Sequence, residues 1–320
     1  MSLEKYWEFL RKVNDLYQAG KYKEVIDFLK DVPNQYPDRK PAIYYHQICA
    51  ASKLSQYDLS IQLIQEILDE GGWYSEMVLR QSPSLKPLQD IPEFEKLLKI
   101  SVERSKHVSS SEHNITLIPD KTNPPYPLML ALHAGSGFIE EEFESWKTIV
   151  DQGYILGMPR SSNVFWSGKD SAYWPDHESA SNQIKAYVEK INIDNTLDLE
   201  RTILGGLSSG GELAIWLALT NPIPICGFIV VAPGGQWMND PDKWKSIIKD
   251  TRNKELKGLI ILGEEDKAVP HESIHQLVNM LNDRGISCQF IKYPGLGHWY
   301  PPDFTDILTS FTNEINSGKR

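Results

Sequence analysis

From residue 113 onward the chain alternates short apolar runs with stretches of helical periodicity. Runs that are apolar along their whole length and separated by helices are typical of a mainly parallel sheet with helices on both faces. We therefore predict an α/β domain over residues 113–320, with helices that include 177–191, 209–220 and 271–284. The predicted strands are NITLI, PLMLALH, YILGMP, RTILGG, CGFIVVA, GLIILG and ISCQFIKY.

Residues 1–100 follow a different pattern, in which apolar residues recur three and four positions apart. This spacing predicts an all-helical domain. Within it, QAGKYKEVIDFL (18–29) aligns with KLSQYDLSIQLI (53–64), and a helical unit repeated at this distance resembles the tetratricopeptide repeat. Two roles fit such a domain: binding of a protein or peptide partner, and shaping of a cleft or an oligomer contact.

The segment between the two patterns, SVERSKHVSSSEH (101–113), is polar and rich in serine. Stretches of this composition are typical of loops between folded parts of a chain. We therefore predict a linker over 101–112 and place the domain boundary there.

Composition and charge narrow the classes of function. Hydrophobic residues make up 41% of the chain, and no apolar run approaches the roughly 20 residues that span a bilayer. The net charge of −10 argues against binding to a nucleic-acid backbone. The N-terminus, MSLEKYWEFLRKV, lacks the apolar stretch of a secretory signal. We expect a cytoplasmic protein that binds neither membranes nor nucleic acid.

One segment, RTILGGLSSGGELAIWLAL (201–219), combines an apolar strand, a glycine-flanked serine and a helix. This is the context in which G-x-S-x-G forms a nucleophile elbow. The flanking glycines allow a tight turn that exposes the Ser208 hydroxyl at the helix N-terminus, and the backbone N–H of Ser209 points to where an oxyanion would form. A phosphate-binding turn is the alternative, but no lysine accompanies the glycines.

A serine hydroxyl needs a histidine base and a carboxylate that orients it. After the strand GLIILG comes EEDKAVP, which contains Asp266, and after CQFIKYP comes GLGHW, which contains His298. Both follow the carboxyl end of a strand, where open α/β sheets gather their ligands. Asp266 is the preferred acid, and its neighbour Glu265 is the alternative.

Residues 113–316 resemble the α/β-hydrolase superfamily, in its carboxylesterase and phospholipase-like, or dienelactone-hydrolase-like, branches. GLSSGG, LGEEDKAVP and YPGLGH carry the resemblance, in the family's order of nucleophile, acid and base. It implies serine hydrolysis of a small-molecule ester or related acyl bond, of the carboxylesterase type, without a metal or organic cofactor. Peptidases of the prolyl-oligopeptidase type share these motifs, and acyl thioesterase activity is a further alternative. A binding protein with a scaffold hydrolase domain is the non-enzymatic alternative.

The resemblance also implies a second oxyanion donor after the strand PLMLALH. Where the family carries H-G-x-G, this chain has LALHAGSGF, so that Ala134 replaces the first glycine. We assign the second donor to the backbone N–H of Gly135. His133 is interpreted as bracing the turn, not as a base.

Aromatic residues mark the loop after the strand YILGMP. In the fold that the resemblance implies, this loop faces the active site, so Trp166, Tyr173 and Trp174 are candidates for a substrate pocket, as is Trp299 beside the base. Sealing of a contact between the domains is the alternative role for the loop aromatics.

The stretch HESIH (271–275) matches the zinc-protease motif H-E-x-x-H. His271 follows Pro270 and falls at the start of the predicted helix, whereas zinc-binding histidines of this class lie within one. The next histidine downstream is His298, which is needed as the base. We expect no metal at this motif.

Overall fold

A computed structural model of the chain describes residues 3–106, 114–120, 122–135, 139–169, 171–251, 253 and 255–317. The chain divides into two compact units. One comprises Met1–Ser111 together with Asn163–Ala172, and the other comprises Glu112–Ser162 and Tyr173–Arg320. A short segment from the middle of the α/β sequence therefore belongs to the helical unit.

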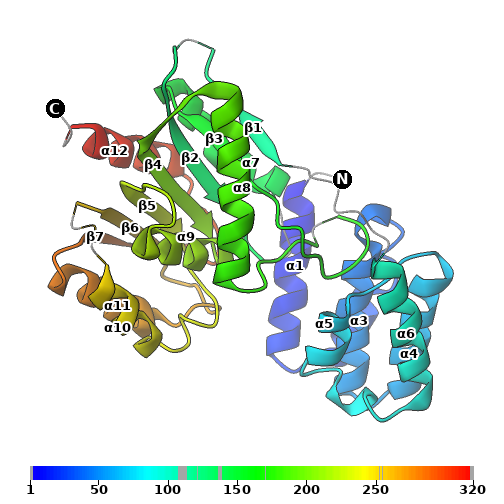
Figure 1. Ribbon diagram of the computed structural model, residues 1–320. Helices are drawn as coiled ribbons and strands as arrows, with labels where there is room; N and C mark the ends of the chain where they lie inside the picture. The colour runs from blue at the N-terminus through cyan, green and yellow to red at the C-terminus, as the bar shows by residue number, and fades with distance from the viewer. Residues whose placement is uncertain are drawn as a thin grey trace. The chain divides into compact units, whose positions relative to one another are not determined.

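The helical unit contains α-helices and two short 3-10 helices, labelled in Figure 1 where there is room. Gly20 and Ser55, which are equivalent in the predicted repeat, both adopt left-handed backbone angles, with φ of 72° and 59°, in the turns that precede α2 and α4. The tetratricopeptide assignment stays a prediction. The elements are α1 (Leu3–Gln18), α2 (Tyr22–Leu29), η1 (Pro37–Arg39), α3 (Lys40–Lys53), α4 (Tyr57–Asp69), α5 (Glu76–Gln81), η2 (Lys86–Leu88) and α6 (Pro92–Lys106).

The linker predicted over 101–112 begins too early. Helix α6 continues through Lys106, and its buried residues include Ser101, whose hydroxyl donates to the carbonyl of Tyr74 at 2.8 Å. A polar composition here therefore reflects a helix with a half-solvated face. Residues 107–112 of the predicted linker lie outside the part of the chain that the structure describes.

The segment 163–172 is bound to the helical unit through its backbone. The N–H of Ser75 donates to the carbonyl of Phe165 at 2.7 Å, and the N–H of Ser167 donates to that of Trp73 at 3.0 Å. The side chain of Trp166 completes the helical core, where its ring lies 5.6 Å from that of Tyr45. The helical unit therefore depends on ten residues that lie far from it in the sequence.

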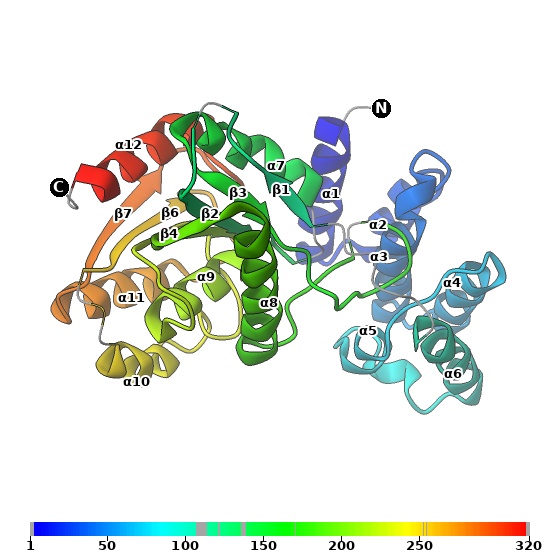
Figure 2. The same cartoon turned by 45° about the horizontal axis from the view of Figure 1, so that its top comes forward.

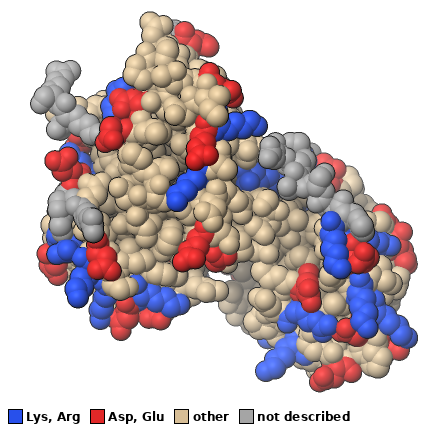
Figure 3. Space-filling view, viewed as in Figure 1, with Lys and Arg blue, Asp and Glu red and all other residues tan. Residues whose placement is uncertain are grey.

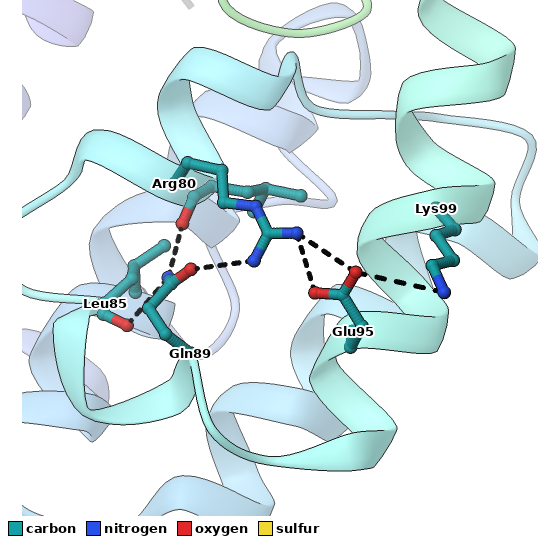
Figure 4. A network of polar contacts seen from close by, with 6 residues as sticks. Arg80, Leu85, Gln89, Glu95 and Lys99 are labelled. Atoms are coloured by element: carbon teal, nitrogen blue, oxygen red, sulfur yellow. Dashed lines mark hydrogen bonds and ion pairs between the residues drawn. The ribbon is translucent and has the colours of Figure 1, made fainter.

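A polar network joins α5 to α6 within the helical unit, as Figure 4 shows. The guanidinium of Arg80 contacts the Glu95 carboxylate at 2.7 Å and donates to the Gln89 side chain at 3.2 Å. Gln89 in turn donates to the carbonyls of Leu79 and Leu85. Arg80 and Glu95 are each partly exposed, so their ion pair contributes little to stability.

The second unit is built on a seven-stranded sheet in the order β1-β3-β2-β4-β5-β6-β7. All pairs are parallel except β1 with β3, which is antiparallel. The predicted α/β class and mainly parallel sheet are confirmed. The strands are β1 (Ile115–Leu117), β2 (Tyr126–Leu132), β3 (Ile155–Met158), β4 (Leu197–Leu207), β5 (Gly227–Val231), β6 (Lys257–Gly263) and β7 (Ser287–Tyr293).

Helices cover both faces of this sheet. Figure 2 shows α7 and α12 on one face, and α8, α9, α10 and α11 on the other. The inner strands β2, β3, β5 and β6 are almost wholly buried between these layers, which is why their sequences are apolar and do not alternate, whereas the edge strands β1 and β7 are partly exposed. The elements are α7 (Ile139–Trp146), η3 (Lys147–Gln152), α8 (His177–Asn195), α9 (Ser209–Thr220), α10 (Asp242–Asp250), α11 (His271–Asp283) and α12 (Phe304–Ser317).

Surface charge and helix hydrophobicity bear on which partners the chain could bind. On the face shown in Figure 3, basic side chains are interspersed with acidic ones. Across the ranges that the structure describes, no helix is both long enough and apolar enough to cross a membrane.

Candidate active site

Ser208 is the one residue between β4 and α9. Its backbone conformation, with φ 53° and ψ −121°, is rare for a residue other than glycine. The left-handed φ of a non-glycine residue is strained, so the surroundings must hold it. Two hydrogen bonds contribute: the N–H of Ser208 donates to the carbonyl of Val231 at the end of β5 at 3.1 Å, and the Ser208 carbonyl accepts from the N–H of Gly234, in the loop after β5, at 3.0 Å. Ser208 therefore lies at the tip of a tight turn from strand to helix, and its role as nucleophile stays a prediction.

Glycines are required at this turn because backbone atoms fill the space where a side chain would be. A Cβ on Gly210 would come within 2.6 Å of the His133 carbonyl oxygen and closer still to that of Leu132. A Cβ on Gly206 would lie 2.6 Å from the carbonyl carbon of Gly210. The start of α9 therefore packs directly against the end of β2, and this brings the serine turn to the predicted oxyanion turn.

Asp266 and His298 follow β6 and β7, and their side chains meet. Nδ1 of His298 lies 2.7 Å from Oδ2 of Asp266, whose other oxygen accepts from the N–H groups of Ala268 at 2.8 Å and Val269 at 3.2 Å. The carboxylate is fully buried, whereas 31% of the imidazole surface is exposed. A neutral imidazole donating from Nδ1 keeps Nε2 free to accept a proton.

The pKa of Asp266 lies below its ordinary value. Burial acts to raise it, but the hydrogen bond and charge interaction with His298 and the two backbone N–H donors outweigh that effect. Its neighbours Glu264 and Glu265 are exposed, and Glu264 pairs with Lys292 at 3.3 Å. Asp266, the preferred acid, is therefore the carboxylate that the structure brings to His298, and Glu265 is not.

The loop that contains Asp266, the predicted acid, adjoins both the loop of His298, the predicted base, and the Ser208 turn. The N–H of Glu264 donates to the carbonyl of Tyr293, and that of Glu265 to Leu296, so the acid loop is bonded to the base loop. On the other side, a Cβ at Gly234 would lie 3.7 Å from Oγ of Ser208 and 3.1 Å from the Val269 side chain. The Ser208 hydroxyl and the acid loop therefore border the same small space.

The two predicted oxyanion donors lie close together. A Cβ on Gly135 would lie 3.7 Å from the Ser209 hydroxyl. Ser209 is the first residue of α9, so its N–H has no carbonyl partner within the helix. The N–H of Ala134 is occupied, because it donates to Oε1 of Glu142 at 2.8 Å. The donor roles of Ser209 and Gly135 remain predictions.

His133 is buried and braces the turn that precedes Gly135. Its Nε2 accepts from the N–H of Ser161 at 3.1 Å, which leaves Nδ1 to donate to the carbonyl of Ala134 at 2.8 Å. Burial lowers the pKa of His133 to about 4. An uncharged, fully bonded imidazole is a structural group, as its sequence context indicated.

Trp174 supports the same turn. Its ring stacks on that of His133 with centroids 4.5 Å apart, and its Nε1 donates to the His133 carbonyl at 2.9 Å. Sequence reasoning assigned Trp174 to a substrate pocket and did not predict this contact.

The other pocket candidates lie in different surroundings. Trp166 is only 7% exposed and packs in the core of the helical unit, so its assignment as a pocket residue is wrong; its apolar bulk completes that core. Tyr173 is half-buried, and burial raises the pKa of its hydroxyl. Trp299 packs its ring edge-on against Tyr300, at 5.3 Å. Pocket roles for Tyr173 and Trp299 remain predictions.

The HESIH histidines have separate partners. His271 lies with Nε2 2.8 Å from the carbonyl oxygen of Asp266, and the ring of His275 packs edge-on against Phe290 at 4.8 Å. Within the described ranges, no group of three or more His, Cys, Asp or Glu side chains is arranged to hold a metal ion. His271 therefore supports the acid loop from the start of α11.

Sequence reasoning missed two buried carboxylates near the site. Glu212 on α9 accepts from the N–H groups of Trp237 and Met238 at 3.0 and 2.9 Å, and so holds the loop after β5. Glu142 on α7 is the second. An acidic residue in the first turn of the helix after the elbow was a signal for Glu212, whereas Glu142 lies in a run of three glutamates that gives no sign of which one is buried.

Two family models match the chain. The one described as "A/B hydrolase-like, N-terminal domain" covers residues 5–109, and the one described as "Phospholipase/Carboxylesterase" covers 173–316. The second range contains Ser208, Asp266 and His298. The helical unit thus corresponds to a domain type already associated with this fold.

Similar proteins agree with these matches. The chain is 28% identical over 120 residues to acyl-protein thioesterase 1 of Gibberella zeae, covering 37% of this chain and 50% of that protein. It is 25% identical over 144 residues to acyl-protein thioesterase 1 homolog 1 of Dictyostelium discoideum, covering 43% and 58%. The chain therefore spans less than two thirds of the length of either relative.

A solved structure shares the whole fold. The crystal structure of an uncharacterized protein from Bacillus cereus is 24% identical, covers 98% of this chain and 99% of its own, and superimposes with a TM-score of 0.55. Residues 173–316 are therefore similar to the phospholipase/carboxylesterase family, and the mainly parallel sheet covered by helices is consistent with an α/β-hydrolase fold.

Proposed function

We propose that the chain is a serine hydrolase that cleaves carboxylic esters through an acyl-enzyme on Ser208. The observation that carries the proposal is the 2.7 Å contact between His298 and buried Asp266, whose loop adjoins the strained serine turn. A carboxylate so placed orients the imidazole and stabilises it once it is protonated. A purely structural ion pair would have no need of a strained serine beside it.

In this mechanism Nε2 of His298 accepts the Ser208 proton as Oγ attacks the acyl carbonyl carbon. The negative charge that develops on the carbonyl oxygen is stabilised by the N–H groups of Ser209 and Gly135. Collapse of the tetrahedral intermediate breaks the bond to the leaving group, which takes the proton from His298. Water, deprotonated by the same imidazole, then releases the acid and restores Ser208.

Thioesters are the second candidate substrates. The curated relatives of this chain are named acyl-protein thioesterases, and the same serine chemistry cleaves either bond because a thiolate is a good leaving group. A peptidase activity has no comparable support. A cytoplasmic location and a partner of the helical unit also stay predictions.

The test is a substrate panel run on wild type and Ser208→Ala: p-nitrophenyl esters, thioesters with the same acyl groups, and aminoacyl amides. We expect ester or thioester hydrolysis that falls by about 10⁴-fold or more in the variant. The ratio of thioester to ester kcat/KM decides between the two candidates. Activity should be unchanged by a chelator, since His271 and His275 bind other groups.

Labelling with a fluorophosphonate probe, followed by peptide mass spectrometry, identifies the nucleophile. Modification of Ser208 alone supports the proposal, and stoichiometric modification of another serine overturns it. A protein that reacts with no serine-directed probe but retains a stable partner in a pull-down would favour the binding-protein alternative.

A further inference from the structure

We infer that Glu142 and Tyr300 form a positioning pair that holds the oxyanion turn and the base loop in fixed relation. The inference rests on the proposed function, because it concerns the geometry of the same reaction. Neither residue belongs to the predicted triad, and neither has to touch substrate for the pair to act.

The two oxygens of Glu142 bind two different loops. Oε1 accepts from the N–H of Ala134 at 2.8 Å, one residue before the proposed donor Gly135. Oε2 accepts from the hydroxyl of Tyr300 at 2.8 Å, two residues after the proposed base His298. One carboxylate on α7 therefore spans from the end of β2 to the loop after β7.

Trp146 connects the pair to β4, the strand that precedes Ser208. The indole Nε1 of Trp146, at the end of α7, donates to the Tyr300 hydroxyl at 2.8 Å. The same indole packs against Gly205, three residues before Ser208, so closely that a Cβ there would lie within 2.6 Å of Cζ3 of the ring. The pair is thus connected to all three parts of the proposed machinery.

Burying these polar groups costs desolvation free energy. Glu142, Tyr300 and Trp146 are 0%, 5% and 0% exposed. Apolar residues of similar volume often stabilise such a site as well as buried charge does, so a buried carboxylate is better explained by the geometry it fixes. Burial, followed by the charge and hydrogen bond of Glu142, raises the pKa of Tyr300 well above its usual range, so its hydroxyl stays a donor.

The spacing of oxyanion donors and base matters because misplacement by about 1 Å can cost about 10²-fold in rate. In Glu142→Gln the amide oxygen can still accept from the N–H of Ala134, but the NH2 group in place of Oε2 cannot accept the Tyr300 hydroxyl proton, so the link between the two loops is broken. The oxyanion turn and the imidazole are then no longer held by one common group, while Tyr300→Phe keeps the ring that packs on Trp299, a pocket candidate. The effect should fall on kcat and leave KM nearly constant.

The experiment compares Glu142→Gln, Tyr300→Phe and the double variant, each with kcat expressed per active site titrated by a fluorophosphonate. We expect each single variant to lose about 10- to 100-fold in kcat with KM within about twofold. The double variant should lose little more than the worse single, because both break one connected pair. The matched control is Glu144→Gln on the same helix, since Glu144 is exposed and pairs only locally with Lys147 in the described contacts; it should behave as wild type.

Three results would overturn the inference: unchanged kcat in both single variants, losses that multiply in the double variant, or losses that disappear on normalisation to titrated sites. If Glu142→Gln does not fold, Tyr300→Phe still tests the link, because it keeps the bond from Ala134 to Glu142. Failure of the proposed function looks different: the wild type itself would then be inactive, or as active as Ser208→Ala.

Discussion

Nδ1 of His298 lies 2.7 Å from Oδ2 of Asp266, and the two residues lie on loops that follow adjacent parallel strands. Asp266→Asn would replace the acceptor by a group that can reverse the imidazole tautomer. We expect kcat to fall by about 10⁴-fold with little change in thermal stability. The neighbouring Glu265→Gln, at an exposed position, is the matched control and should stay within about twofold of wild type. The reverse outcome would show that Glu265 is the acid.

Acid should destabilise the protein partly through His133. Burial lowers its pKa to about 4, against about 6.5 in an unfolded chain, so between these values the unfolded state binds a proton that the folded state does not. Stability must therefore fall as the pH drops through this window. From pH 7 to pH 5 the contribution is on the order of 2 kcal/mol.

Urea unfolding of wild type and His133→Gln at both pH values measures this difference. The free energy of unfolding should decline less in the variant. His46, whose pKa burial also lowers to about 4, remains in both proteins and cancels in the comparison. An equal decline in the two proteins would show that His133 does not contribute.

Trp174→Phe tests the brace behind the oxyanion turn. The phenyl ring can still stack on His133, but the hydrogen bond to the His133 carbonyl is lost, which should cost about 1 kcal/mol in the free energy of unfolding. Trp216→Phe is the control, because Trp216 also stacks on a histidine, His177, without an indole hydrogen bond in the described residues. Equal losses in the two variants would assign the effect to ring size alone.

Gly210→Ala tests the close approach of α9 to β2. Its Cβ would meet the carbonyl oxygens of Leu132 and His133, which cannot move without disturbing both elements, so we expect a loss of about 3 kcal/mol or more in stability. Gly297→Ala, where a Cβ would have no neighbour within 4 Å, should unfold at nearly the wild-type temperature. Thermal denaturation followed by circular dichroism distinguishes the two.

The sequence was sufficient to predict those features whose physical cause lies in residues close together in the chain or in the ends of neighbouring strands. Each predicted strand appears in the sheet, and the inner ones are apolar because both of their faces are covered. The Ser208 turn was predictable because a tight strand-to-helix turn demands glycine at Gly206 and Gly210, which are neighbours in the chain. The contact of Asp266 with His298 followed from two strand ends that a parallel sheet places at the same edge.

Tertiary structure decided what depends on distant partners. Trp166 lies in an aromatic loop that nothing local assigns to one core or another, and it joins the helical unit because Tyr45 and Tyr74 provide its surroundings there. Glu142 is one of three consecutive glutamates, and only the fold determines that it faces inward. Its partner Tyr300 is 158 residues away, and no periodicity in the sequence can report a hydrogen bond over that separation.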